Sequence, residues 1–118
     1  MSVTITKTSG FTASITWDPQ DDATGYLARA VESDQLAYSL EALGGGVVAE
    51  TEEQALLAAQ HTTALARELE RRAAVQVVRL RDTHGLSWRR IAAVVLDDPD
   101  RQSGVRRMYE SGRRSIGI

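Results

Sequence analysis

A long helical pattern over residues 52–84 constrains the fold of this chain more than any other segment. Thr51 and Gln54 have the spacing of a capping box that starts the helix, and His84 with Gly85 forms a stop signal. Apolar residues at helical spacing mark one stripe along it: Ala66, Leu69, Ala73, Val77 and Leu80. The stripe predicts a packing surface, used either within the chain or across a dimer axis.

Two further features refine this long helix. Val75 and Val78 widen the apolar surface near its end, where we expect another helical unit to dock. Glu68 and Arg72 are four residues apart and form a favourable charge pair on the outer side.

Alternating apolar and polar residues predict a β-hairpin within residues 1–17. We expect a three-residue loop at residues 8–10, with Gly10 at positive φ. The cross-strand pairs are then Lys7 with Phe11, Ile5 with Ala13, and Val3 with Ile15. This register gathers the apolar side chains on one face, which must pack on helices or on a second copy because an isolated hairpin is marginally stable.

The segment between the hairpin and the long helix is also helical in pattern. After a break at Asp18 and Pro19, residues 22–43 carry apolar residues at helical spacing, and residues 32–34 divide them into two short helices. Three glycines at 44–46 end the second helix. Residues 47–49 form either a third strand on the hairpin or a short apolar linker.

Charge separates the two ends of the chain. Residues 1–66 hold two cations and nine acids, a net charge of −7, whereas residues 67–118 hold twelve arginines and seven acids, a net charge of +5. The basic end is the one that can meet phosphates, and the acidic end would repel them. We therefore expect the two ends to have different functions.

Residues 85–114 predict two consecutive helices joined by an acidic turn at residues 96–100. Ser87 is the expected N-cap of the first helix, with Arg89 and Arg90 pointing outward. Its expected buried face comprises Trp88, Ile91, Ala92 and Val95. The second helix, which extends to about Arg114, has an inner face of Val105, Met108, Tyr109 and Gly112. Its opposite face carries Ser103, Arg106, Arg107, Glu110, Arg113 and Arg114.

From about Val75 to Arg114, the last third of the chain resembles the helix-turn-helix of bacterial transcription regulators, in particular the region-4 type of sigma factors. The residues that carry the resemblance are the Gly-Leu-Ser-Trp segment at 85–88, the Ile-Ala pair at 91–92 and the arginine-rich last helix. The resemblance implies that the last helix enters the major groove while Ser87, Arg89 and Arg90 contact the DNA backbone.

The turn departs from the family pattern. The apolar residue that the family places ten positions after its first-helix alanine would be Gln102, whereas Val105 lies thirteen positions after Ala92. Either the turn carries about three extra residues, or the helix starts at Pro99 with Asp98 as N-cap.

Catalytic and metal-binding motifs are lacking in the sequence. There is no cysteine, and His61 and His84 stand far apart without nearby carboxylate pairs, so we expect no metal, no cofactor and no enzymatic activity. Trp88 and Tyr109 fit core positions better than base-stacking ones, with the Tyr109 hydroxyl at the rim. No apolar run is long enough to span a membrane.

The sequence thus predicts a mainly α-helical α+β protein with an acidic hairpin-plus-helix assembly region at 1–50 and a DNA-binding region at 51–118. The predicted function is sequence-specific double-stranded DNA binding by a cytoplasmic, nucleoid-associated transcriptional regulator, acting as a homodimer. The expected DNA-binding residues are Ser87, Arg89, Arg90, Arg101, Ser103, Arg106, Arg107, Glu110, Arg113 and Arg114. The alternative is a protein-interaction module, such as a phage or mobile-element inhibitor of a host factor, acting through its acidic N-terminal half.

Overall fold

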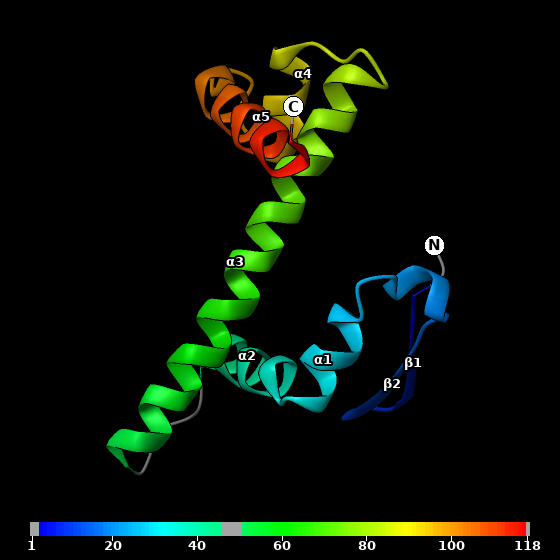
Figure 1. Ribbon diagram of the computed structural model, residues 1–118, viewed down its shortest axis with the longest axis vertical. Helices are drawn as coiled ribbons and strands as arrows, with labels where there is room; N and C mark the ends of the chain where they lie inside the picture. Colours follow the sequence, from blue (N-terminus) through cyan, green and yellow to red (C-terminus); the bar gives the residue numbers. More distant parts are fainter. Residues whose placement is uncertain (1–2, 46–50, 118) are drawn as a thin grey trace. The chain divides into compact units, whose positions relative to one another are not determined.

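The computed structural model describes residues 3–45 and 51–117 and confirms the mainly helical α+β class (Figure 1). Its elements, in chain order, are β1 (Thr4–Ser9), β2 (Thr12–Thr16), the 3-10 turn η1 (Pro19–Asp22), α1 (Tyr26–Glu32), α2 (Gln35–Gly44), α3 (Glu52–Asp82), α4 (Trp88–Val95) and α5 (Gln102–Ile116). The chain divides into two compact units, residues 1–65 and 66–118, and the division falls inside the sequence of α3. The expected boundary at residue 50 precedes this junction, and residues 47–49, which the sequence left as strand or linker, lie outside the described residues.

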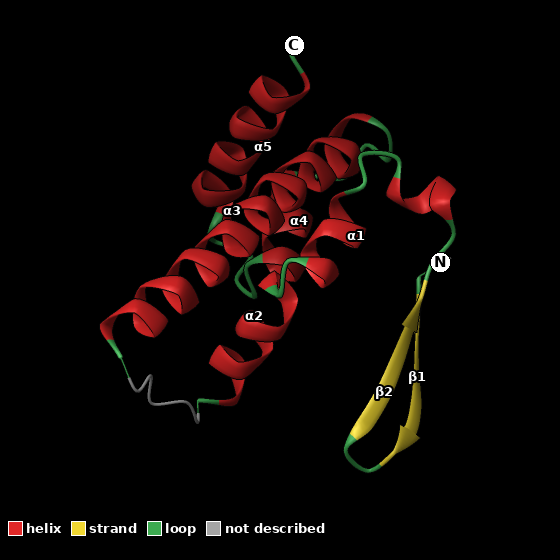
Figure 2. Ribbon diagram, turned by 60° about the horizontal axis from the view of Figure 1, so that its bottom comes forward, coloured by secondary structure: helices red, strands yellow, loops and turns green. Residues whose placement is uncertain are grey.

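The hairpin forms (Figure 2), but the pairing of its residues differs from the predicted register. Ile5 pairs with Ile15 and Lys7 with Ala13, whereas the expected partners of Ile5 and Lys7 were Ala13 and Phe11. The loop is Gly10-Phe11, and an irregularity in the pairing lies between Lys7 and Ser9. The observed register therefore differs from the predicted one by two residues. Because side chains alternate with a period of two, each face of the hairpin keeps the predicted residues.

The hydroxyl groups near the hairpin loop account for this difference. The Ser9 hydroxyl accepts a hydrogen bond from the Phe11 amide at 3.3 Å and bonds the Thr12 hydroxyl at 2.6 Å. A turn closed in this way does not need a residue at positive φ, and the prediction that Gly10 has positive φ is wrong.

The two short helices α1 and α2 separate where the sequence predicted. Asp34 lies between them in the left-handed conformation, with φ of 65°. Helix α1 begins at Tyr26 rather than at residue 22, because the Asp22 carboxylate caps it by accepting bonds from the amides of Leu27 and Ala28. Helix α2 ends at Gly44, as expected, and Gly45 follows with φ of 67°.

The long helix α3 begins at residue 52 as predicted and ends at Asp82, two residues before the predicted end. The Gln54 amide donates to the Thr51 hydroxyl at 3.1 Å, and Gly85, after the last turn, has φ of 64°. Its predicted stripe is only partly correct: Val77 is buried, whereas Leu69 is 58% exposed and Ala66 is also exposed. The buried apolar residues of α3 are Ala74, Val77 and Val78, at the end that contacts α4 and α5. Glu68 pairs with Arg72 at 2.9 Å as predicted, but the prediction that it lies on the outer side is wrong, since Glu68 is 9% exposed.

The second unit has a small, fully closed core. It consists of Val77, Ile91, Ala92 and Val105, each at most 1% exposed, with Leu80, Leu86, Trp88, Leu96, Met108 and Tyr109 packed around it. Helix α5 crosses α3 at Gly112, where a Cβ atom would come within 3 Å of the Ala74 carbonyl and of the Val78 side chain. A glycine is therefore required for this close approach of two helices.

The connection between α4 and α5 is longer than in the pattern that the sequence resembles. Helix α5 begins at Gln102 with Arg101 as N-cap, so Val105 reaches the core and the alternative start at Pro99 is wrong. The prediction that Val95 is buried is also wrong, since Val95 is 37% exposed and Leu96 packs against the core in its place.

Candidate nucleic-acid interface

Helix α5 has two faces of opposite character, as the sequence predicted. The inner face buries Val105 and Gly112 and half-buries Met108 and Tyr109. The outer face exposes Arg101, Ser103, Arg106, Arg107, Glu110, Arg113 and Arg114. A well-packed inner face holds the outer arginines on a rigid support.

Trp88 connects α4 to arginines of both neighbouring helices. The Arg81 guanidinium lies 4.4 Å from the centre of its ring, and that of Arg106 lies at 5.6 Å. Arg81 also donates to the Leu86 carbonyl at 2.9 Å, while the Tyr109 ring meets Trp88 edge-on at a centroid distance of 5.2 Å. The half-buried Trp88 is therefore a packing anchor that also restricts the position of Arg106.

Tyr109 has a similar role further along α5. Its hydroxyl donates to the Asp82 carboxylate at 2.7 Å, and Arg113 lies over its ring at 5.7 Å. The hydrogen bond to Asp82 is the main cause that raises the pKa of Tyr109 above its ordinary value of 10.0. This bond joins the end of α3 to α5, as expected for a core tyrosine with its hydroxyl at the rim.

The residues predicted to contact the DNA backbone, Ser87, Arg89 and Arg90, lie at the N-terminus of α4. The Ser87 hydroxyl accepts from the Arg90 amide at 3.1 Å, which confirms the predicted N-cap. Arg89 and Arg90 are exposed in the first turn, and Arg89 forms an exposed ion pair with Asp100 at 3.4 Å. This pair screens some of the positive charge that the sequence assigned to the site.

The exposed arginines of this region fall into two groups. Arg106 and Arg113 lie over aromatic rings and Arg89 has an acidic partner. Within the described residues, the side chains of Arg90, Arg101, Arg107 and Arg114 form no hydrogen bond, ion pair or ring contact. Their charges are available for an external anion.

The acidic turn between α4 and α5 is organised by Asp98. Its carboxylate accepts from the Asp100 amide at 2.9 Å, and its carbonyl accepts from the Arg101 amide at 3.1 Å. Asp97 stands in the left-handed conformation with φ of 56°. These acids shape the turn, but their charges disfavour phosphate close to it.

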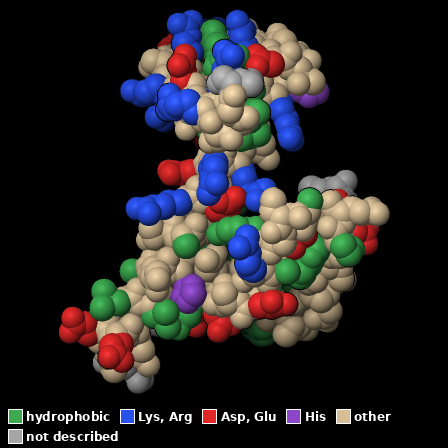
Figure 3. Space-filling model, viewed as in Figure 1, with side chains coloured by type: hydrophobic (Ala, Val, Ile, Leu, Met, Phe, Trp, Pro, Cys, Tyr) green, Lys and Arg blue, Asp and Glu red, His purple; other side chains and the backbone are tan. Residues whose placement is uncertain are grey.

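The division of charge matches the division into compact units. All twelve arginines counted in the basic end belong to residues 66–118, whereas residues 1–65 hold two cations and nine acids. Figure 3 shows the resulting gathering of basic side chains, all of them arginines, over the region that contains α4 and α5. The long-range field of the second unit therefore attracts anions.

Sequence reasoning missed two residues that support this surface, Arg81 and Asp82. Both lie in the last turn of α3 and were counted only as charges. Their contacts with Trp88 and Tyr109 arise where the chain folds back on α3, and no periodic pattern marks them.

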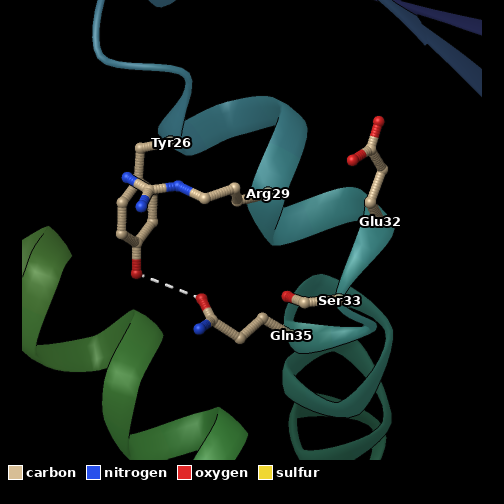
Figure 4. A pocket seen from close by; sticks show the side chains of 5 residues that line it. All are labelled: Tyr26, Arg29, Glu32, Ser33 and Gln35. Carbon is tan, nitrogen blue, oxygen red and sulfur yellow. Dashed lines mark hydrogen bonds between the residues drawn. The ribbon is translucent and has the colours of Figure 1, made fainter.

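The first unit contains an open pocket of about 440 Å³ between α1 and α2, lined by Tyr26, Arg29, Glu32, Ser33 and Gln35. Figure 4 shows the Tyr26 hydroxyl donating to the Gln35 side-chain oxygen at 3.0 Å, with Arg29 over the Tyr26 ring. These contacts join Tyr26 to Gln35 and to Arg29 within the pocket lining.

Metal-binding and membrane-spanning features are absent from residues 3–45 and 51–117. This stretch of the chain holds no group of three His, Asp or Glu side chains arranged for a metal ion, and His61 instead stacks on Tyr38 with centroids 5.1 Å apart. None of its helices is long and apolar enough to cross a membrane.

Comparison with known protein families, with characterised proteins and with solved structures finds no match to this chain.

Proposed function

We propose that this protein is a sequence-specific double-stranded DNA-binding transcriptional regulator that inserts α5 into the major groove. One observation carries the proposal: α5 is packed tightly against α3 and α4 on one face and presents a dense row of arginines on the other. A rigidly supported helix with outward-facing arginines can enter the major groove and place those side chains against the edges of the bases.

The two kinds of arginine on α5 suit two kinds of contact. Arg106 and Arg113 are restrained by the Trp88 and Tyr109 rings, so they lose less conformational freedom when they bind guanine through two hydrogen bonds. Arg107 and Arg114 extend from the same helix and are suited to phosphate oxygens or to further base contacts.

The start of α4 supplies the backbone contacts in this proposal. Its amide groups and the exposed Arg89 and Arg90 side chains form a positive end that favours phosphate. The exposed Arg89–Asp100 pair is an ion pair of the weak class, and its replacement by a phosphate contact costs little.

A homodimer completes the proposal, because one small helical unit covers too few base pairs for tight specific binding. The acidic first unit is the region assigned to assembly, since its net charge of −7 repels DNA. Such a regulator would act at the nucleoid in the cytoplasm.

A pair of matched arginine variants tests the proposal. Fluorescence anisotropy measures binding to a duplex carrying the region upstream of the protein's own gene, with a random duplex beside it. Arg107→Ala is expected to weaken binding by about 1–3 kcal/mol, roughly 5- to 150-fold. Arg29→Ala removes the same charge from the first unit and is expected to have a much smaller effect. Equal effects of the two variants, or no binding by the parent protein, would contradict the proposal.

A second candidate function is supported by the surface of the first unit. Phe11 is 102% exposed and Leu43 is 84% exposed, in a unit that is strongly acidic. Exposed apolar residues of this size favour a protein-interaction module. Two variants distinguish the candidate functions. An activity that survives Arg107→Ala but is lost in Leu43→Asp would favour the protein-interaction module over DNA binding.

A further inference from the structure

We propose that strand β2 pairs with β2 of a second copy of this chain, edge to edge and antiparallel, to form a four-stranded sheet across a twofold axis. The dimer expectation rests on the proposed DNA-binding function, but the pairing itself is argued from the hairpin and is tested without DNA.

The hairpin is a two-stranded sheet, so each strand has one edge whose backbone groups have no strand partner in the described residues. Two isolated strands are marginally stable in water, and their free N–H and C=O groups are a template for another strand. Both faces of the hairpin are also largely exposed. A further strand would satisfy the free backbone N–H and C=O groups at an edge of the hairpin.

The two edges differ in how they are protected. Strand β1 carries the charge of Lys7 and an irregularity between Lys7 and Ser9, and both features hinder pairing at an edge. Strand β2 has the sequence Thr-Ala-Ser-Ile-Thr, which contains no charge and no proline and is rich in β-branched residues. The edge of β2 is therefore the one open to pairing.

The residues of β2 are self-complementary about Ser14. In an antiparallel pair centred there, Ala13 lies opposite Ile15 of the second copy and Thr12 lies opposite Thr16. Phe11, which is fully exposed, and Trp17 flank β2 at its two ends, outside the strand itself, so Phe11 of one copy falls at the same end of the pair as Trp17 of the other. Each apolar residue meets an apolar one and each hydroxyl meets a hydroxyl, which are favourable cross-strand pairs. This match identifies a second copy as the occupant.

The absence of cysteine in the chain makes a direct test clean. In the proposed sheet, Cys side chains in Ser14→Cys lie directly opposite each other, at a Cα separation of about 5 Å that suits a disulfide. Thr6, the partner of Ser14 on β1, lies three strand spacings from its copy, about 14 Å, which is too far. Thr6→Cys is thus a matched control on the same face and row.

Each variant is incubated at micromolar concentration in an oxidising glutathione buffer without DNA, and disulfide dimers are counted on non-reducing gels. Ser14→Cys is expected to cross-link at least about tenfold faster than Thr6→Cys, as the difference in Cα separation requires. Equal rates, a faster Thr6→Cys, or no cross-link in either variant would overturn the proposal.

Sedimentation of charged variants gives a second, independent measurement. The parent protein is expected at twice the monomer mass of 12.9 kDa, and Ser14→Lys at the monomer mass, because two lysines would face each other at the axis. Thr6→Lys is expected to remain a dimer. A Ser14→Lys variant that remains dimeric would overturn the proposed pairing. That result would leave the DNA-binding proposal standing, because Arg107→Ala tests it in a separate assay.

Discussion

Replacement of Gly112 by alanine tests the packing that holds α5 in place. A Cβ at this position would lie 2.8 Å from Val78 Cγ2 and 2.7 Å from the Ala74 carbonyl carbon. The backbone of α3 cannot move aside as a flexible side chain can. Overpacking of this kind costs about 1–3 kcal/mol.

A gain in helix propensity opposes this cost. Alanine is favoured over glycine within a helix by about 1 kcal/mol. Because the added Cβ meets backbone atoms, we expect a steric cost in the upper half of its range, about 2–3 kcal/mol. After the propensity gain of about 1 kcal/mol is subtracted, Gly112→Ala should destabilise the second unit by about 1–2 kcal/mol.

Gly104→Ala is the matched control on the same helix. Its Cβ would lie 2.9 Å from the end of the Leu96 side chain, which packs on the rim of the core and can shift more easily than the backbone of α3. The propensity gain then remains, and we expect Gly104→Ala to be between neutral and about 1 kcal/mol more stable than the parent.

Urea unfolding followed by Trp88 fluorescence in a Trp17→Phe background measures the stability of the second unit by itself, since these are the two tryptophans of the chain. The expected order of midpoints is Gly104→Ala at or above the parent, and Gly112→Ala below both. A Gly112→Ala variant as stable as its parent would refute the close approach of α5 to α3.

Changes at three further positions have defined outcomes. Ser87→Ala removes the side chain that caps α4 and is expected to lower the free energy of unfolding of the second unit by about 1 kcal/mol, measured in the same urea assay; an unchanged midpoint would contradict the cap. Absorbance titration should show Tyr109 losing its proton above the ordinary tyrosine range, and Asp82→Asn should bring its pKa down. Because the pKa of Tyr109 is raised on folding, its contribution to stability is complete below pH 10 and is lost as the pH rises through the raised pKa; a pH-independent difference between parent and Asp82→Asn in alkali would count against this. Asp34→Gly should raise the melting temperature, since glycine adopts the positive φ found there with less strain, whereas Asp34→Ala should lower it.

Local signals in the sequence predicted where α3 and α4 begin, and where α3 ends to within two residues. Ser87, Thr51 and Gly85 act within a few residues of their own position, so their roles follow from side-chain chemistry and backbone preference alone. The two faces of α5 follow in the same way from helical periodicity.

Features that depend on contacts across the fold were not predictable from the sequence. The hairpin register depends on hydroxyl bonds at Ser9, and alternation of residue types does not distinguish registers that differ by two. The burial of Leu96 in place of Val95 depends on the path of the long turn. Leu69 fits the apolar stripe of α3 but lies beyond the reach of α4 and α5.

The candidate interface was predicted as a set of charges rather than as a geometry. Its exposed residues were identified correctly, because helix periodicity fixes which side of α5 they occupy. The restraint of Arg106 by Trp88, and of Arg113 by Tyr109, requires the packed arrangement of three helices. The contacts of Arg81 with Trp88 and of Asp82 with Tyr109 also depend on this packed arrangement.

The salt dependence of DNA binding tests the central claim most directly. The parent protein is titrated onto the upstream duplex and onto a random duplex at several salt concentrations. The account predicts a preference of about a thousandfold or more for the upstream duplex, and a log–log slope near −0.9 for each phosphate that the arginines neutralise. Absence of binding to either duplex at low salt would contradict the assignment of α5 as a recognition helix.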